Sequence, residues 1–491
     1  MRGIIASFWL LAVGLCLLTA CSSQPVDVRL VDQQPTIYPD YKDVTIPVEI
    51  APLNFDVVGE GIDRVDVKVV GSKGGELHAN GEYADFDIDE WHTLTAQNKG
   101  GELTVTVCAR KDGQWLQYQD FKILVSPYPL EEWGVTYRRI APGYEVYSHM
   151  GLYQRDLSSF EELAILENTQ APGQCLNCHM SNRTDPSHFV FHVRGTHGAT
   201  MIQIDGKREW LKAKNDLLGG SMVYPYWHPS GDYCAFSTNQ TRQGFHSIAK
   251  ERIEVLDLSS DIFVYHPATH EILTDSLIQT KEWAENSPVF SPDGKTLYYI
   301  TCKKQEDPNR FKEERYNLCK IAFDPEKGTF GNHVDTLFNA AAMGKSLTWP
   351  RPSYDGKYIL FTLIDYGYFS VWHDESEQWL LDLQTGEAHS LEAANSPRAD
   401  SYHNWSVNSH WIVFTSRRDD GLYSRLYFSS IDEDGKVSKP FMLPQRCPKE
   451  YYDESVYSFN TPDFTKTKVN FDAGAAGREI MSDKRIDTNV K

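Results

Sequence analysis

The sequence has no second long apolar run. After the stretch at 4–18, no segment approaches the length of a membrane-spanning helix. An excess of basic residues is also missing: 48 Lys and Arg stand against 68 Asp and Glu, and the net charge is −20. This balance argues against nucleic acid as a partner and against direct adhesion to anionic lipid. We therefore expect a body outside the bilayer with no nucleic acid bound.

Familiar catalytic patterns are absent as well. The sequence contains neither a phosphate loop nor a Ser/His/Asp pattern in a recognisable context. A single CxxC is present at 175–178, and no second one exists to complete a zinc site. We assign no catalytic residue, and the sequence favours a non-enzymatic role without deciding it.

The first residues resemble a secretion signal. Arg2 precedes the apolar stretch Ile4 to Leu18, and Leu18-Thr19-Ala20-Cys21 matches the box cut by bacterial lipoprotein signal peptidase. We expect a signal peptide at 1–20, lipidation of Cys21 and a polar tether at 21–37. No Asp follows Cys21, which suggests an outer-membrane lipoprotein facing the periplasm. An ordinary cleaved signal or a short anchor is the alternative.

Short runs of alternating apolar residues dominate 38–126, with glycine-rich turns between them. This pattern is typical of a small antiparallel, Ig-like β-sandwich. Pro127-Tyr128-Pro129 then marks a boundary, because two prolines cannot continue a β-ladder. We expect a sandwich domain at 38–126 and a second domain at 127–491.

The second domain carries a diverged repeat. Its clearest copy is the turn Ser291-Pro292-Asp293-Gly294-Lys295 between two apolar runs. Related turns open near Arg183 and at His228, Ser353, Ser406 and Thr461. Hairpins about every 50 to 60 residues, each followed by further strands, predict four-stranded propeller blades. Six or seven blades are both open, and an irregular all-β array is the alternative.

The run Cys175-Leu176-Asn177-Cys178-His179 is a CxxCH motif in a chain that we expect to be exported. Two such thiols can add to the vinyl groups of one haem, and the imidazole can then bind the iron as proximal ligand. This predicts one covalent haem c at a mouth of the propeller, in the loop that enters the innermost strand. A disulfide, a redox dithiol and a metal site are the alternatives.

The second axial ligand of such a haem is left open by the sequence. Met180 is too near His179 in the chain to reach the other side of the ring. The candidates are His188, His192, His197, Met201 and Met222. A five-coordinate iron is also allowed. Elsewhere, Cys302 and Cys319 fall on expected neighbouring strands, either as a disulfide or as two small buried side chains.

The repeats resemble the TolB-type propeller, built from WD40-like repeats with the turn seen at 291–295. The whole chain also resembles lipoproteins of the Bacteroidota that combine an N-terminal sandwich, one CxxCH and a TolB-like propeller. Tyr38-Pro39-Asp40-Tyr41 and the run at 223–231 carry that resemblance. It implies a membrane-anchored periplasmic c-type haem protein whose propeller face docks a redox or envelope-assembly partner. The alternative is a non-haem scaffold that binds protein or glycan.

Overall fold

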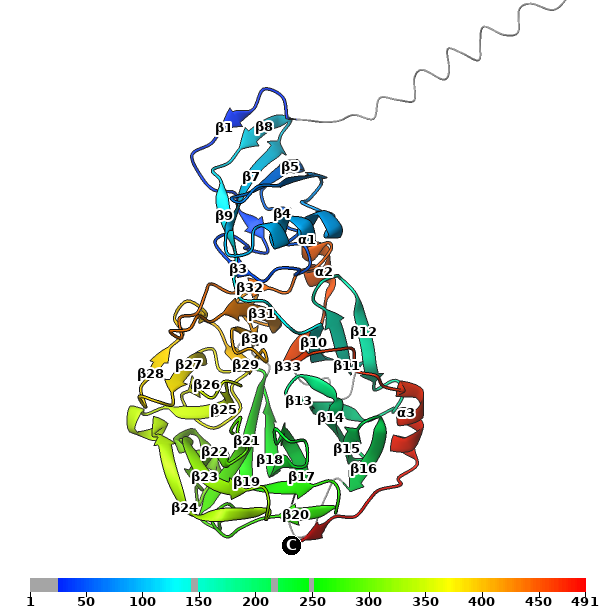
Figure 1. Ribbon diagram of the computed structural model, residues 1–491, viewed down its shortest axis with the longest axis vertical. Coiled ribbons are helices and arrows are strands. Elements are labelled where there is room, and N and C mark those ends of the chain that lie inside the picture. Colours follow the sequence, from blue (N-terminus) through cyan, green and yellow to red (C-terminus); the bar gives the residue numbers. More distant parts are fainter. Residues whose placement is uncertain (1–24, 143–148, 213–219, 247–250) are drawn as a thin grey trace, which may run out of the picture.

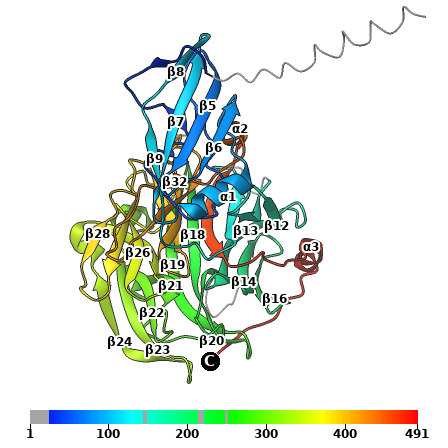
Figure 2. The same cartoon turned by 45° about the horizontal axis from the view of Figure 1, so that its top comes forward.

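The computed structural model describes residues 25–142, 149–212, 220–246 and 251–491. Within them, six β-sheets surround a common axis, and a smaller N-terminal domain lies at the edge of this ring (Figure 1). Sheets arranged radially in this way make a propeller. The predictions of an all-β chain and of a propeller are confirmed. Figure 2 shows the N-terminal domain projecting beyond the ring at its upper side.

Five sheets each consist of four consecutive antiparallel strands. They are β13 (Cys175–Asn182), β14 (Asp185–Arg194), β15 (Ala199–Ile204) and β16 (Lys207–Lys212); β17 (Ser221–Trp227), β18 (Cys234–Phe245), β19 (Ile253–His266) and β20 (Glu271–Leu273); β21 (Trp283–Phe290), β22 (Thr296–Lys303), β23 (Asn317–Asp324) and β24 (Thr329–Phe338); β25 (Ser346–Pro352), β26 (Tyr358–Ile364), β27 (Glu377–Asp382) and β28 (Ala388–Ser390); β29 (Asp400–Trp405), β30 (Trp411–Ser416), β31 (Arg425–Ser430) and β32 (Phe441–Met442).

The remaining sheet of the ring joins the two ends of the propeller sequence. It contains β10 (Gly134–Ile140), β11 (Gly151–Asp156), β12 (Glu162–Glu167) and, from the C-terminal region, β33 (Ser458–Thr465). Strand β33 pairs with β10 and occupies the innermost place that the first strand takes in every other sheet. Ring closure therefore depends on pairing across more than 300 residues. A short strand, β34 (Asn489–Val490), pairs with β20 and extends the sheet of β17 to β20.

In three of the predicted turns, the side chain of the opening serine forms hydrogen bonds within the turn, one of them with a backbone N–H group. Ser291 donates from its Oγ to Asp293 and accepts from the backbone N–H of Thr296. Ser353 and Ser406 open their turns in the same way. Side chains that replace ladder partners at a turn fix its geometry locally. This local origin explains why these hairpins were visible in the sequence.

Thr461 is a correction to the sequence-based prediction. It was expected to open a turn, but it lies inside β33 at a bulge opposite β10. The Pro after Thr461 belongs to this bulge, and no hairpin follows because the second strand of this sheet is β10, which comes from the start of the propeller sequence. The same residue becomes important at the channel.

The N-terminal domain has a main sheet of seven strands. The main sheet contains β1 (Arg29–Leu30), β3 (Thr45–Ile46), β5 (Ile62–Gly71), β6 (Glu76–Gly81), β7 (Glu102–Lys111), β8 (Gln114–Gln117) and β9 (Phe121–Val125). A two-stranded sheet of β2 (Ile37–Tyr38) and β4 (Asp56–Val57) and helix α1 (Ile88–Gln97) complete it. Asp87 caps α1 by accepting from two N–H groups of its first turn.

Part of the predicted tether belongs to this domain. Strand β1 pairs with β8, and the carbonyl of Gln33 accepts from the backbone of Gln119. A polar segment can do this because the free edge of β8 offers backbone groups that need no apolar side chain. The expected signal peptide and the predicted lipidation site at Cys21 lie outside the described residues. No helix in the part of the chain that the structure describes is long and apolar enough to cross a membrane.

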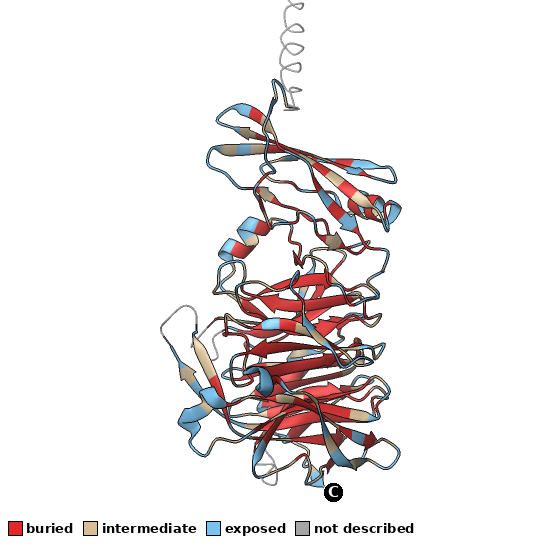
Figure 3. Cartoon of the chain, turned by 90° about the vertical axis from the view of Figure 1, so that its left-hand side faces the viewer, coloured by how far each residue is buried: buried red, intermediate tan, exposed pale blue. Residues whose placement is uncertain are grey.

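The two domains share one continuous apolar core, and the buried strands of the ring stack beneath the N-terminal domain (Figure 3). Tyr41 is fully buried and donates to the carbonyl of Met442, and Tyr38 donates to Asp419. The motif that carried the sequence resemblance therefore lies at the domain junction. Two further helices, α2 (Pro448–Glu454) and α3 (Ala473–Met481), flank the ring closure.

Cys302 and Cys319 lie on adjacent strands, β22 and β23, as expected. They are not opposite each other, because Cys319 pairs with Tyr299 and Cys302 with Ala284. Both are buried and free. In this structure they are two small buried side chains, not a disulfide.

Candidate functional site

Each of the six innermost strands carries one bulge at a corresponding position. The bulge residue has a positive φ between 47° and 54° in every case, although none of the six is glycine. They are Cys178, Tyr224, Ser287, Trp349, Tyr402 and Thr461. A bulge interrupts the ladder and re-aims a side chain. Cys178 is therefore one member of a structural ring around the channel.

The residue that follows each bulge residue is of one of two types. It is proline in four strands and histidine in the other two, His179 and His403. His179 lies beside the backbone of Thr136 on β10, and His403 beside that of Leu360 on β26. Since β10 and β26 are the corresponding strands of the preceding sheets, the two imidazoles fill the same place. His179 is a wedge between neighbouring sheets.

Both wedge histidines are buried and neutral. Burial lowers the pKa of His179 to about 4 and that of His403 to about 3. A backbone oxygen lies near each ring, but no ring nitrogen of either residue forms a hydrogen bond of good geometry with the described residues. An imidazole buried in this way loses its hydration without full compensation.

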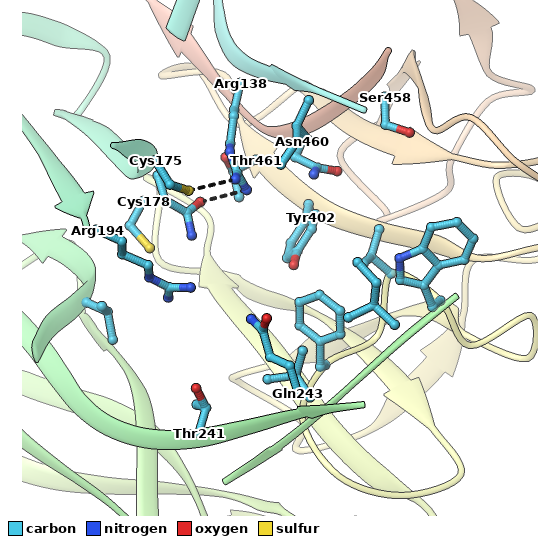
Figure 4. A pocket seen from close by; sticks show the side chains of 18 of the residues that line it. Arg138, Cys175, Cys178, Arg194, Thr241, Gln243, Tyr402, Ser458, Asn460 and Thr461 are labelled. Carbon is cyan, nitrogen blue, oxygen red and sulfur yellow. Dashed lines mark hydrogen bonds between the residues drawn. The ribbon is translucent and has the colours of Figure 1, made fainter. Parts of the chain in front are cut away.

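The two thiols of the motif face a different space. A cavity of about 400 Å³ opens at the mouth of the channel, and Cys175 and Cys178 line it (Figure 4). Along a strand, alternate side chains share a face, so Cys175 and Asn177 point into the cavity while Leu176 enters the core. The bulge then returns Cys178 to the cavity face. The motif lies within β13, not in the expected loop before it.

Three arginines dominate the charge of this cavity: Arg138, Arg194 and Arg417. Arg138 donates from Nη2 to Sγ of Cys175 at 3.2 Å and from Nη1 to Oδ1 of Asn177 at 3.3 Å. No Asp, Glu or Lys stands among the described residues of its wall. In a chain of net charge −20, this is a locally cationic site.

Aromatic side chains and a long hairpin form the rest of the wall. Aromatic rings come from three sheets and the loops within them: Tyr224, Phe245, Tyr368, Phe369, Trp372 and Tyr402. Strands β18 and β19 are the longest of the ring, at 12 and 14 residues, and their far ends contribute Thr241, Gln243, Ile253 and Val255. A concave space with an apolar body and a few polar groups is typical of a small-molecule site.

His179 does not reach this cavity. It borders a separate space of about 10 Å³, which shares Cys178, Tyr224 and Thr461 with the larger cavity. That volume is about one water molecule, so no flat macrocycle fits beside the imidazole. The thiols suit covalent attachment at a cavity wall, but the three residues as placed do not form a complete haem c site.

The predicted second axial ligands do not line either cavity. They are His188, His192, His197, Met201 and Met222. The three histidines have other side chains as hydrogen-bond partners, and the two methionines are fully buried in apolar clusters. Four of the five follow β13 on β14, the next turn and β15, away from the channel. The structure does not bring them to the thiols.

The sequence missed most of the cavity. Beyond the two cysteines little in the sequence marks it: Arg417 stands in a charged turn after β30 and Tyr224 in an aromatic run, and neither pattern alone identifies a site. Arg138 and Arg194 carried no local signal. Register alone links Arg194 to the motif, because it pairs with Cys175 across β13 and β14.

No protein-family model and no curated protein sequence matches the chain. Among solved structures, TolB from Acinetobacter baumannii is 14% identical with a TM-score of 0.43, over 77% of this chain and 86% of that one. The periplasmic gluconolactonase of Pseudomonas aeruginosa is 12% identical with a TM-score of 0.35, over 67% and 99%. We base the propeller architecture on the sheets themselves and infer no activity from these distant similarities.

If His179 is a wedge, proline should replace it. We expect His179→Pro to fold with a melting temperature within a few degrees of the wild type, because four equivalent positions already hold proline. Met180→Pro is the matched control: Met180 pairs with Val190 in the ladder, and proline there removes an N–H donor in the middle of a sheet, so we expect a clear drop in melting temperature. Differential scanning calorimetry separates the two. An unfolded His179→Pro protein would contradict the wedge role.

Burial of neutral His179 also predicts an acid-dependent loss of stability. The unfolded imidazole takes up a proton near pH 6.5 and the folded one only near pH 4. Between these values the unfolded state binds more protons, so the contribution of His179 falls as pH falls, by about 1.4 kcal/mol per pH unit. Urea unfolding from pH 7 to pH 4 should show the wild type losing about 3 kcal/mol relative to His179→Pro. His333→Ala, at an exposed site, serves as control, and a constant difference would refute the neutral buried ring.

Proposed function

We propose that this protein is an envelope-anchored binding protein whose propeller holds a small ligand at the mouth of its channel. The observation that supports it is the cavity of about 400 Å³, within the range of known ligand sites and lined by convergent polar and aromatic side chains. The wall residues come from five of the six sheets. No single hairpin makes this site, and ring closure is needed to form it.

The finer architecture belongs to the same proposal. The ring is a six-bladed TolB-like propeller that β33 closes, and the N-terminal domain is an Ig-like spacer. A lipid on Cys21 anchors the chain to the outer membrane, with its body facing the periplasm. A protein partner docks on the propeller face, and nucleic acid is no partner, in keeping with the net charge of −20.

Blocking the cavity should abolish binding without unfolding the ring. Thr241 is exposed on β18 and lines the cavity, so Thr241→Trp would fill space there. Thr329→Trp, also exposed on a strand but on the outer β24, is the matched control. A ligand at a hundred times its Kd stabilises the folded state by about 2.7 kcal/mol.

A thermal-shift screen of a diverse small-molecule library then tests the proposal. We expect compounds that stabilise the wild type and Thr329→Trp but not Thr241→Trp. If every stabilising compound acts equally on all three proteins, or none acts on the wild type, the cavity is not a ligand site.

Covalent haem c is a second candidate, favoured by one observation: both thiols of the CxxCH line the same cavity. Cys175 and Cys178 would hold the macrocycle, whose iron would supply redox chemistry. His179 would have to leave its place between the sheets to serve as proximal ligand, and neither of its ring nitrogens forms a well-aligned hydrogen bond with the described residues that would hold it there.

This candidate predicts covalent haem in protein made alongside c-type maturation enzymes. A pyridine haemochrome spectrum and a mass increase of one haem should appear in the wild type. Both should persist in a Cys302→Ala, Cys319→Ala control and disappear in Cys175→Ala, Cys178→Ala. Colourless wild-type protein of unmodified mass would eliminate haem and leave the cavity proposal intact.

A further inference from the structure

We propose that the ligand of the channel-mouth cavity is an anion joined to a flat apolar body, and that Arg138, Arg194 and Arg417 bind its negative group. This inference rests on the proposed function, because it names the ligand class of that cavity. A carboxylate, sulfonate or phosphate group would satisfy it.

The three arginines converge from separate parts of the chain. Arg138 lies on β10, Arg194 on β14 and Arg417 directly after β30. Among the described residues, none of the three forms an ion pair, although acidic residues outnumber basic ones in this chain by 20. Three like charges around one space repel one another, so an anion between them would stabilise the arrangement.

Arg418, the next residue in the chain, differs from Arg417 in its partners. Its guanidinium pairs with buried Asp400 at 2.7 Å. Arg417 instead stacks over the ring of Trp372, and its buried Nε and Nη1 have no hydrogen-bond partner in the part of the chain that the structure describes. Nε of Arg138 is likewise buried and unpartnered. Unmade hydrogen bonds of buried charged donors are costly. Among the described residues of this wall, the buried side-chain donors left unsatisfied therefore include those of these two arginines and the hydroxyl of Thr461.

The apolar part of the wall fits a flat group. Tyr224 and Tyr368 on this wall meet edge to face with ring centroids 6.2 Å apart. Tyr402, also on the wall, is held in the same way at 4.8 Å by Trp349, which lines only the small space beside His179. Trp372 adds a further ring below Arg417. Rings in such arrangements present edges and faces to an aromatic guest. A guest with both an aromatic body and a negative group uses both parts of the wall.

Two fluorescent probes with the same aromatic body test the charge. 8-Anilinonaphthalene-1-sulfonate is an anion, and N-phenyl-1-naphthylamine lacks its sulfonate. We expect the anion to bind the wild type at least about tenfold more tightly than the neutral probe, and Arg194→Gln to remove that advantage. Arg310→Gln, which breaks an exposed pair with Glu313, should change neither affinity. Circular dichroism and melting temperature check the fold of each variant.

The wild type alone gives a second readout. Binding of the anionic probe should weaken with added salt and with inorganic pyrophosphate, whereas binding of the neutral probe should not. Equal affinities of the two probes, or an anionic affinity unchanged in Arg194→Gln, would overturn the inference. If Thr241→Trp still blocks both probes in that case, the cavity binds ligands and only the charge assignment fails. No binding of the anionic probe to the wild type overturns the inference, and the library screen then decides the proposed function by itself.

Discussion

The bulge in each innermost strand is the constraint on which the rest of this structure depends. Six strands converge on one axis, and each interrupts its ladder at a corresponding residue. At that level the chain sends one side chain to the channel and the next between two sheets. The cavity at the channel mouth, the place of both thiols and the burial of His179 all follow from this single local distortion.

Much of the ring could be predicted because its signals are local. A serine that opens a turn satisfies backbone groups within five residues of itself, as at Ser291, so the turn is visible in a short stretch of sequence. Thr461 was misread because its Thr-Pro pair resembles the start of such a turn, whereas it is the last of the six bulge positions and the fourth that proline follows. The N-terminal domain was harder, since several of its strands are only two residues long. Pairing partners, not composition, define strands of that length.

The candidate site was only half predictable, for a physical reason. Cys175 and Cys178 are three residues apart, so the CxxCH motif is recognisable in the sequence. Arg138, Arg194 and Arg417 meet only because β33 returns to β10 and closes the ring. Nothing in the sequence around each arginine is unusual. What is unusual is that the three line one cavity whose described wall residues include no carboxylate. Electrostatic character that arises from ring closure has no counterpart in a linear pattern.

The geometry of a CxxCH depends on the element that carries it. On a helix, residues i, i+3 and i+4 share one face. The two cysteines and the histidine of a CxxCH have this spacing, so both thiols and the imidazole can contact one macrocycle. On a strand, alternation separates i from i+3, and one bulge is needed to return Cys178 to the side of Cys175. The following residue then leaves that side, and His179 enters the gap between the sheets. A bulged strand can gather two members of the motif but not three, and this is why the thiols and the imidazole of this protein face different spaces.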